Sequence, residues 1–191
     1  MIINDISKLV METKIETITG FIESILDTKY AFWIPNDSMI GNFGPCWVSN
    51  ESFPDMEKIK SEGVNCSGLI NLVRRKIGLT IPYLNENYKY AGGTRAYVNY
   101  FKNNIEKFNR DKNYKFSLLI QDYSNPIEQG HLGIISDNII YHSRTDNDFD
   151  FNLKGCLLSP GVQKTIMADI DYDFLSSRDF YTCDMEIWLN K

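Results

Sequence analysis

The sequence lacks any concentration of basic residues. It contains 20 Lys and Arg against 25 Asp and Glu, for a net charge of −5. The longest basic run, Arg74-Arg75-Lys76, lies in an amphipathic pattern and is most simply the solvated side of a helix. A protein that binds nucleic acid through its phosphates needs a positive patch. We therefore expect no nucleic-acid partner.

Long apolar runs are also absent. No window approaches the roughly 18 apolar residues that a helix needs to cross a bilayer. The opening residues, MIINDISKLVMETK, do not combine a basic region with an apolar stretch as a secretory signal does. These absences predict a soluble protein without a membrane span or signal peptide, which is either cytoplasmic or delivered by a non-classical route.

Cysteine and histidine are few and scattered. The four cysteines lie far apart without a C-x-x-C pair: Cys46, Cys66, Cys156 and Cys183. Only two histidines are present. A structural zinc site takes four such ligands, usually in closely spaced pairs, and a chain of 191 residues does not need a disulfide framework. We expect no metal and no cofactor.

What the chain does contain is enough apolar material for one core. Its 191 residues are 43% hydrophobic, which predicts a single domain over residues 1–191. Apolar residues from Ile6 to Leu26 recur at spacings of three and four, which predicts one or two helices ending near Asp27. Residues 34–63 are rich in Pro, Gly, Asn and Ser. They predict a long loop or lid, with at most a short helix near Asp55 to Lys60.

Two more helices are expected before the pattern changes to strands. The first lies in VNCSGLINLVRRKIGL, with Asn65 as N-cap and Gly78 as the C′ residue. The second is predicted from Thr94 to about Phe108. Strands are predicted in FSLLIQDY, HLGIIS and NIIYHS, and near Gln163 to Met167 and Met185 to Leu189. Helices followed by an antiparallel sheet indicate an α+β fold.

Cys66 is the first candidate for chemistry. It follows the N-cap, and the positive end of a helix dipole favours a thiolate over a thiol. Ser67 and Gly68 are small, which leaves the sulfur approachable. Cysteines more often pack as small buried hydrophobic residues. We expect that ordinary role for the other three: Cys46, Cys156 and Cys183.

The two histidines can meet on one face of a hairpin. If Asp137-Asn138 forms a two-residue turn, Gly133 lies opposite His142, and His131 lies diagonal to His142 on the same face. Diagonal neighbours are roughly 7–8 Å apart at the backbone, which two imidazole rings can span. Gly133 leaves the space between them open. A loop with an odd number of residues would break this arrangement.

These segments together resemble the NlpC-type cell-wall cysteine peptidase family. The family carries D-C-S-G-L, then a helix and G-[IL]-x-[LI]-P, then strands G-H-V-G-I-Y and [FI]-[VI]-H-[AS], and upstream Y-x-W-G-G. The similar segments here are Asn65–Ile70 (NCSGLI), Gly78–Pro82 (GLTIP), Gly130–Ile135 (GHLGII), Ile140–Ser143 (IYHS) and Tyr30–Phe32 (YAF). They follow the family's order over residues 14 to 145.

The resemblance implies a papain-like fold in which the helix carrying Cys66 packs on an antiparallel sheet. It implies that Cys66 is the nucleophile, His131 the base and His142 the residue that orients the base. Tyr30 and Ser67 would lie at the substrate. The Cys66 backbone N–H would hold the oxyanion.

The implied function is hydrolysis of an amide bond in a peptide, with peptidoglycan stem peptides as the family's usual substrate. Asn65 in place of Asp, Trp33-Ile34 in place of Gly-Gly, and the expanded segments 34–63 and 83–115 depart from the family around the cleft. A papain-like acyltransferase, deamidase or lipid-processing enzyme is the alternative. A binding module with an idle site is a second alternative, against which the presence of all three triad residue types argues. The oligomeric state stays open.

Overall fold

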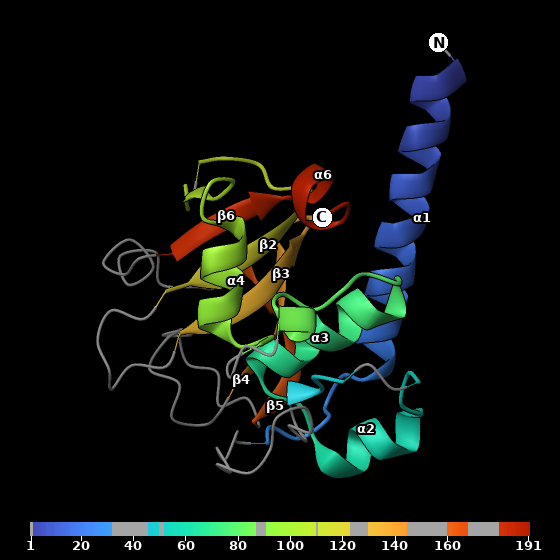
Figure 1. Cartoon of the computed structure of the whole chain (residues 1–191), viewed down its shortest axis with the longest axis vertical. Coiled ribbons are helices and arrows are strands. Elements are labelled where there is room, and N and C mark those ends of the chain that lie inside the picture. The colour runs from blue at the N-terminus through green and yellow to red at the C-terminus, as the bar shows by residue number, and fades with distance from the viewer. Residues whose placement is uncertain are drawn as a thin grey trace.

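The chain has an α+β fold in which helices precede an antiparallel sheet, as the sequence predicts (Figure 1). The structure, a computed structural model, describes residues 2–31, 46–49, 52–86, 91–109, 111–122, 130–144, 160–167 and 180–191. The helices are α1 (Ile2–Ser24), α2 (Met56–Glu62), α3 (Cys66–Lys76), α4 (Thr94–Phe101) and α6 (Met185–Trp188), with a short 3₁₀ helix η2 (Leu84–Glu86). The strands are β1 (Glu106–Lys107), β2 (Phe116–Gln121), β3 (His131–Ser136), β4 (Ile139–Arg144), β5 (Gly161–Ile166) and β6 (Phe180–Asp184).

Within the described residues the strands form one sheet in the order β1-β6-β2-β3-β4-β5, with every neighbouring pair antiparallel. The β3–β4 hairpin turns at Asp137 and Asn138, whose φ angles are 45° and 67°. Positive φ at both central residues is the requirement of the tight hairpin turn that matches strand twist. Gly133 consequently lies opposite His142, which confirms the predicted register.

Helix α3 begins and ends where the sequence predicts. The Asn65 side chain accepts a hydrogen bond from the Gly68 N–H at 2.7 Å. At the other end Gly78 has a φ of 74°, and the Leu79 N–H donates to the Arg74 carbonyl at 2.8 Å. Many helices end at a glycine in this conformation, because a residue with a side chain would be strained at a positive φ. Both caps are local, which is why the sequence revealed them.

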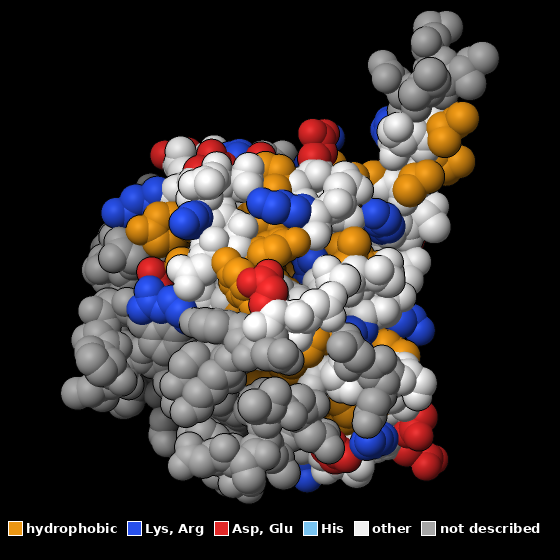
Figure 2. All heavy atoms as spheres, viewed as in Figure 1, with side chains coloured by type: hydrophobic (Ala, Val, Ile, Leu, Met, Phe, Trp, Pro, Cys, Tyr) orange, Lys and Arg blue, Asp and Glu red, His pale blue; other side chains and the backbone are white. Residues whose placement is uncertain are grey.

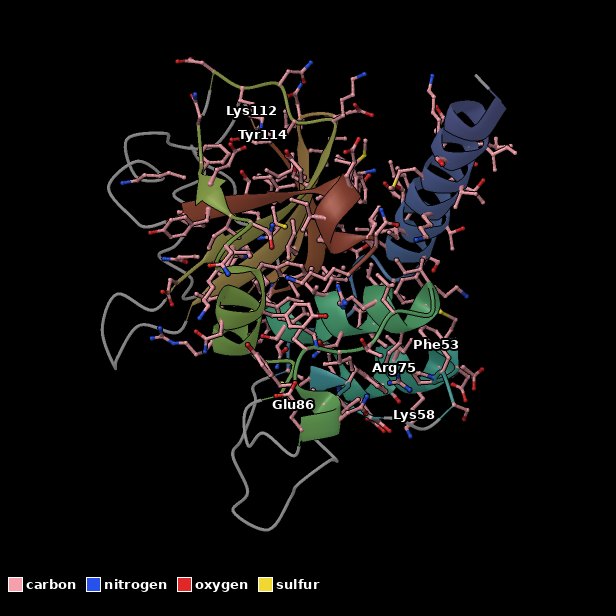
Figure 3. The ribbon with its side chains drawn as sticks, turned by 45° about the horizontal axis from the view of Figure 1, so that its top comes forward. Phe53, Lys58, Arg75, Glu86, Lys112 and Tyr114 are labelled. Atoms are coloured by element: carbon pink, nitrogen blue, oxygen red, sulfur yellow. The ribbon has the colours of Figure 1, made fainter. Side chains whose placement is uncertain are left out.

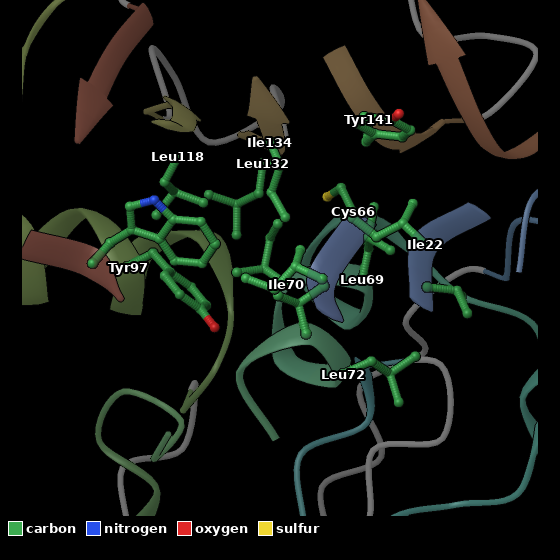
Figure 4. Packing of buried hydrophobic residues seen from close by; sticks show 14 of the residues in the cluster. Ile22, Cys66, Leu69, Ile70, Leu72, Tyr97, Leu118, Leu132, Ile134 and Tyr141 are labelled. Carbon is green, nitrogen blue, oxygen red and sulfur yellow. The ribbon is translucent and has the colours of Figure 1, made fainter. Parts of the chain in front are cut away.

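The main core lies between the sheet and the pair α1 and α3. Strand alternation turns four residues of β2 and β3 toward these helices: Leu118, Ile120, Leu132 and Ile134. Helix α3 packs against them with Leu69, Ile70, Leu72 and Val73, and α1 with Ile18, Ile22 and Ile25. Figure 4 shows Cys66 within this cluster, next to the residues of the helix that carries it. The core therefore holds the start of α3 firmly against the sheet.

Helix α1 is a single helix that ends at Ser24, near the predicted limit of Asp27. Its first half was expected to turn an apolar side inward. Instead it runs beyond the sheet, and three of its apolar residues are exposed (Figures 1 and 2): Ile6, Leu9 and Val10. The spacing that predicts a helix does not say how much of it finds a partner. Of the helices described, none is long and apolar enough to span a membrane.

The predicted helix from Thr94 to Phe108 is wrong in its second half. Helix α4 ends at Phe101, and Glu106–Lys107 instead form β1 on the edge of β6. The Phe108 N–H continues this pairing by donating to the Phe180 carbonyl at 2.9 Å. After Phe101 come Lys-Asn-Asn, and asparagine is a poor helix former whose side chain competes for backbone hydrogen bonds. The sheet edge then offers better partners.

The strand predicted at Met185 to Leu189 is also wrong, because this segment forms α6. Alternating apolar residues suggested a strand. In a strand, Trp188 and Leu189 would point to opposite faces, whereas both are fully buried in the main core. A helical turn lets neighbouring residues reach the same core. Trp188 stacks on Phe116 of β2 with ring centroids 5.6 Å apart.

The described parts of the 34–63 segment are packed rather than open. The predicted short helix is present as α2, and the Asp55 side chain accepts from the Lys58 N–H at 2.7 Å. Trp47 is buried, and its Nε1–H donates to the Gly63 carbonyl at 3.0 Å.

Phe53 of the same segment also has a packing role. It lies edge-on to Phe21 of α1 at 5.5 Å, and the Arg75 guanidinium lies 5.9 Å from its ring centroid (Figure 3). Of the three Phe and Trp residues in segment 34–63, Trp47 and Phe53 therefore anchor local packing. Phe43 lies outside the described residues.

Candidate functional site

Cys66 occupies the first position of α3, directly after the N-cap. It is 9% exposed, and its Sγ lies 4.0 Å from the Gly130 carbonyl oxygen and 4.0 Å from Ser67 Oγ. Gly130 is the residue immediately before His131, the first residue of β3. The thiol is thus placed at the start of the strand that carries the predicted base. The first N–H groups of a helix have no acceptor within the helix and can serve an anion.

Gly130 is required by the crowding around this strand start. A β-carbon at this position would lie 2.5 Å from the Gln121 carbonyl oxygen and 2.8 Å from Thr94 Cγ2. Thr94 begins α4, and its hydroxyl lies 3.3 Å from that of Ser67. Ser67 is therefore buried between the thiol and α4. The start of α3, the start of α4 and the end of β2 converge here.

The two histidines meet as the hairpin register predicts. His131 Nε2 and His142 Nδ1 are 3.1 Å apart, and the ring planes stand at 87°. Both rings are buried, and His142 has no exposed surface. A direct ring-to-ring hydrogen bond in a buried position fixes the orientation of both imidazoles.

Thr165 extends this chain of hydrogen bonds. Its Oγ1 lies 3.0 Å from His142 Nε2, and the residue is buried on β5. Sequence reasoning missed Thr165 as a site residue. It falls within the strand predicted at 163–167, and only the pairing of β4 with β5 shows that it faces His142.

Burial lowers the pKa of His142 well below its ordinary value, and the nearby charges of His131 and Arg144 lower it further. His142 is consequently neutral, with one N–H donor and one acceptor nitrogen. If Nε2–H donates to Thr165, then Nδ1 accepts from the His131 Nε2–H. In this tautomer His131 keeps an unprotonated Nδ1, which is the form that a general base needs.

The other described cysteines differ from Cys66 in their surroundings. Burial raises the pKa of both Cys46 and Cys183 to about 12. Cys46 also accepts a hydrogen bond from the Asn65 side chain at 3.0 Å. Both are free and buried, as expected for packing cysteines. Cys156 lies outside the described residues.

Tyr30 lies on a segment that is hydrogen-bonded to the residues just before Cys66. The carbonyl of the preceding Lys29 accepts from the N–H of Val64 at 3.0 Å, and Val64 lies two residues before Cys66. Lys29 also forms an isolated bridge with Gly161 of β5. Tyr30 itself is half-buried. The structure thus places its segment beside the start of α3.

Further polar residues flank the histidines, among them Gln121, which with Asp122 is the alternative to His142 for the third role. Gln121 lies opposite His131, Gln163 opposite His142, and Arg144 two residues beyond His142 on β4. All three are buried. No composition or motif signal singles out Arg144 and Gln163, because the sheet register alone brings them beside the histidines.

Among the residues that the structure describes, no group of three His, Cys, Asp or Glu side chains could hold a metal ion. No family model, curated protein or solved structure matches the chain. The interpretation of the site therefore depends on its geometry.

Proposed function

We propose that this chain is a cysteine hydrolase with a papain-like fold, akin to the NlpC-type peptidases, that cleaves an amide bond. Cys66 is its nucleophile, His131 its base and His142 the residue that orients the base. The observation that supports this best is the 3.1 Å contact between the two buried imidazoles. His131 is the first residue of β3, and the carbonyl oxygen of the residue before it, Gly130, lies 4.0 Å from Cys66 Sγ.

The proposed reaction has two halves. His131 Nδ1 takes the thiol proton, and the Cys66 thiolate attacks the carbonyl carbon of the amide. The oxyanion is held by the N–H at the start of α3, where the helix dipole favours negative charge. The His131 imidazolium then protonates the leaving nitrogen, and the C–N bond breaks to leave a thioester.

In the second half, His131 removes a proton from water, which attacks the thioester and releases the carboxylic acid and the thiol. Ser67, whose Oγ lies 4.0 Å from Cys66 Sγ, and Tyr30, which follows the residue bonded to Val64, are the proposed substrate contacts. The proposed substrate is a peptide, with peptidoglycan stem peptides as the first class to test.

The test is incubation with purified peptidoglycan and with casein, followed by mass analysis of released fragments. We expect fragments whose new ends show a hydrolysed amide, and no release by the Cys66→Ala variant. Cys183→Ala is the matched control, because it removes a buried cysteine on β6. Equal release by the wild type and the Cys66 variant would contradict the proposal.

An idle binding module is distinguished by thiol reactivity. Iodoacetamide near neutral pH should modify Cys66 faster than Cys46 and Cys183, whose pKa values are about 12. Mass mapping of the alkylated peptides measures the rates in the native protein. Equal rates at all three positions would remove the argument for an activated thiol.

A further inference from the structure

Three buried polar side chains surround the histidine pair on one face of the sheet. In the sheet register Gln121 is paired with His131, and Gln163 is paired with His142. The β3–β4 register, continued by two residues from the Gly133–His142 pair, brings Arg144 opposite His131. Paired residues on adjacent strands point to the same face. The catalytic base of the proposed hydrolase thus has Gln121 on one side and Arg144 on the other.

Hydrogen-bonding atoms of these side chains are left without partners. Arg144 is 7% exposed, and within the described part of the chain its Nε and Nη1 contact no acceptor. Gln163 is 8% exposed, and neither atom of its amide has a partner there. Gln121 is 1% exposed, and among the described residues its Oε1 has no hydrogen-bond partner. Buried polar atoms are hydrogen-bonded in most native structures, so this concentration beside one site needs an explanation.

Of the three side chains, Arg144 is the most costly to bury, because it carries a charge. A guanidinium stays charged under all ordinary conditions, so it cannot lose its proton to avoid burial. A buried charge without a partner is strongly unfavourable unless an anion joins it. The guanidinium fork matches a carboxylate, which can accept two parallel hydrogen bonds. Gln163, diagonal to Arg144 on the same face, offers a further N–H donor.

We infer that Arg144 and Gln163 form a binding site for a carboxylate of the substrate, next to the bond that is cleaved. The inference rests on the proposed function, because it assigns the substrate class of that site. The substrate is an amide that carries a free carboxylate within a few bonds of the scissile carbonyl. Such a group would enter opposite His131 and complete the hydrogen bonds of Arg144.

Two alkylating reagents that differ only in charge test this site. Iodoacetate and iodoacetamide both transfer their CH₂ group to the Cys66 thiolate with loss of iodide, but only iodoacetate carries a carboxylate. The measured quantity is the ratio of the two rates at Cys66, compared with the same ratio for the chain unfolded in urea. A charge-assisted hydrogen bond should raise the native ratio roughly tenfold or more.

The Arg144→Met variant should return the ratio to that of the unfolded chain. Lys164→Met is the matched control, because it removes one positive charge from the neighbouring strand, on the opposite face, where Lys164 pairs with Glu23. Its ratio should equal that of the wild type. If Arg144→Met does not fold, saturable protection of wild-type Cys66 from iodoacetate by acetate, and not by acetamide, tests the site directly.

The outcomes separate the two proposals. A native ratio equal to the unfolded one, without protection by acetate, would overturn the carboxylate site and leave the hydrolase standing. A raised ratio that persists in Arg144→Met would overturn the assignment of Arg144. If Cys66 reacts with both reagents no faster than Cys46, the proposed function falls, and the carboxylate site falls with it.

Discussion

The two faces of the sheet are both buried, but they differ in what they bury. The face toward α1 and α3 is apolar, with Leu118, Ile120, Leu132 and Ile134. The opposite face has an apolar cluster around Leu119, Ile135 and Ile140, and beside it the polar group of Gln121, His131, His142, Arg144 and Gln163. Packing explains the apolar residues of the first face, where Trp188 Nε1 and Arg74 Nη2 are the buried atoms without a hydrogen-bond partner among the described residues. The second face gathers five such atoms on three neighbouring side chains, Gln121, Arg144 and Gln163, and this concentration lowers stability and points to a function.

The largest effect should follow from His131→Ala on the polar face. Without the base, neither thiolate formation nor protonation of the leaving group is assisted. We expect turnover to fall by about 10⁴-fold or more, in line with the loss of a triad member in other hydrolases. Turnover of a peptide substrate with a continuous readout measures this. A loss below tenfold would remove His131 from the mechanism.

His142→Ala should reduce turnover less, by roughly 10² to 10³-fold, because an orienting residue contributes less than the base it orients. Thr165→Val removes only the hydroxyl that contacts His142 and should reduce turnover by a smaller factor than His142→Ala. The rate constants of both variants, measured with the same substrate, test this order. Unimpaired activity of His142→Ala would move the third role to Gln121, which is paired with His131, or to Asp122, the residue that follows it.

The free energy of unfolding should fall as the pH drops below about 6.5, because the pKa of His142 is lower in the folded than in the unfolded chain. The unfolded chain binds a proton on this residue that the folded chain does not bind. The contribution is complete above the ordinary pKa of histidine and is lost at about 1.4 kcal/mol per pH unit below it. Urea unfolding between pH 5.0 and 7.5 measures the slope. His142→Gln should flatten it, and an unchanged slope would show that folding does not lower the pKa of His142.

The smallest expected effects come from one substitution on each face of the sheet, measured as changes in the free energy of unfolding. Gln163→Leu replaces an unpartnered amide with an apolar side chain of similar size and should stabilise the protein by about 1 kcal/mol. Ile134→Val on the apolar face leaves a small cavity and should destabilise it by about 1 kcal/mol. Urea unfolding at pH 7.5 gives both free energies of unfolding. Destabilisation by Gln163→Leu would mean that the amide is satisfied.

Much of the site could be predicted because its signals are local. Asn65 and Gly78 delimit α3 through hydrogen bonds that span three to five residues. The two-residue turn at Asp137-Asn138 sets the register that joins His131 to His142. Each of these depends on backbone rules that act within one element.

Other parts could not be predicted because they depend on distant partners. The segment after Phe101 leaves the helix because β6 offers an edge, and Met185–Leu189 is helical because Trp188 and Leu189 share one core. Both predictions are wrong because apolar spacing along the chain does not give the position of the partner that each segment packs against or pairs with.

The sequence by itself determined the α+β order, the helix that begins at Cys66 and the hairpin that pairs the two histidines. The reason is that caps and tight turns act through nearest neighbours along the chain. Only the tertiary structure decided that Gly130 lies at the thiol, that Thr165 faces His142, and that Nε and Nη1 of Arg144 are buried without an acceptor among the described residues. Those contacts join residues from strands and helices far apart in the chain, and they exist only once the sheet has selected its neighbours.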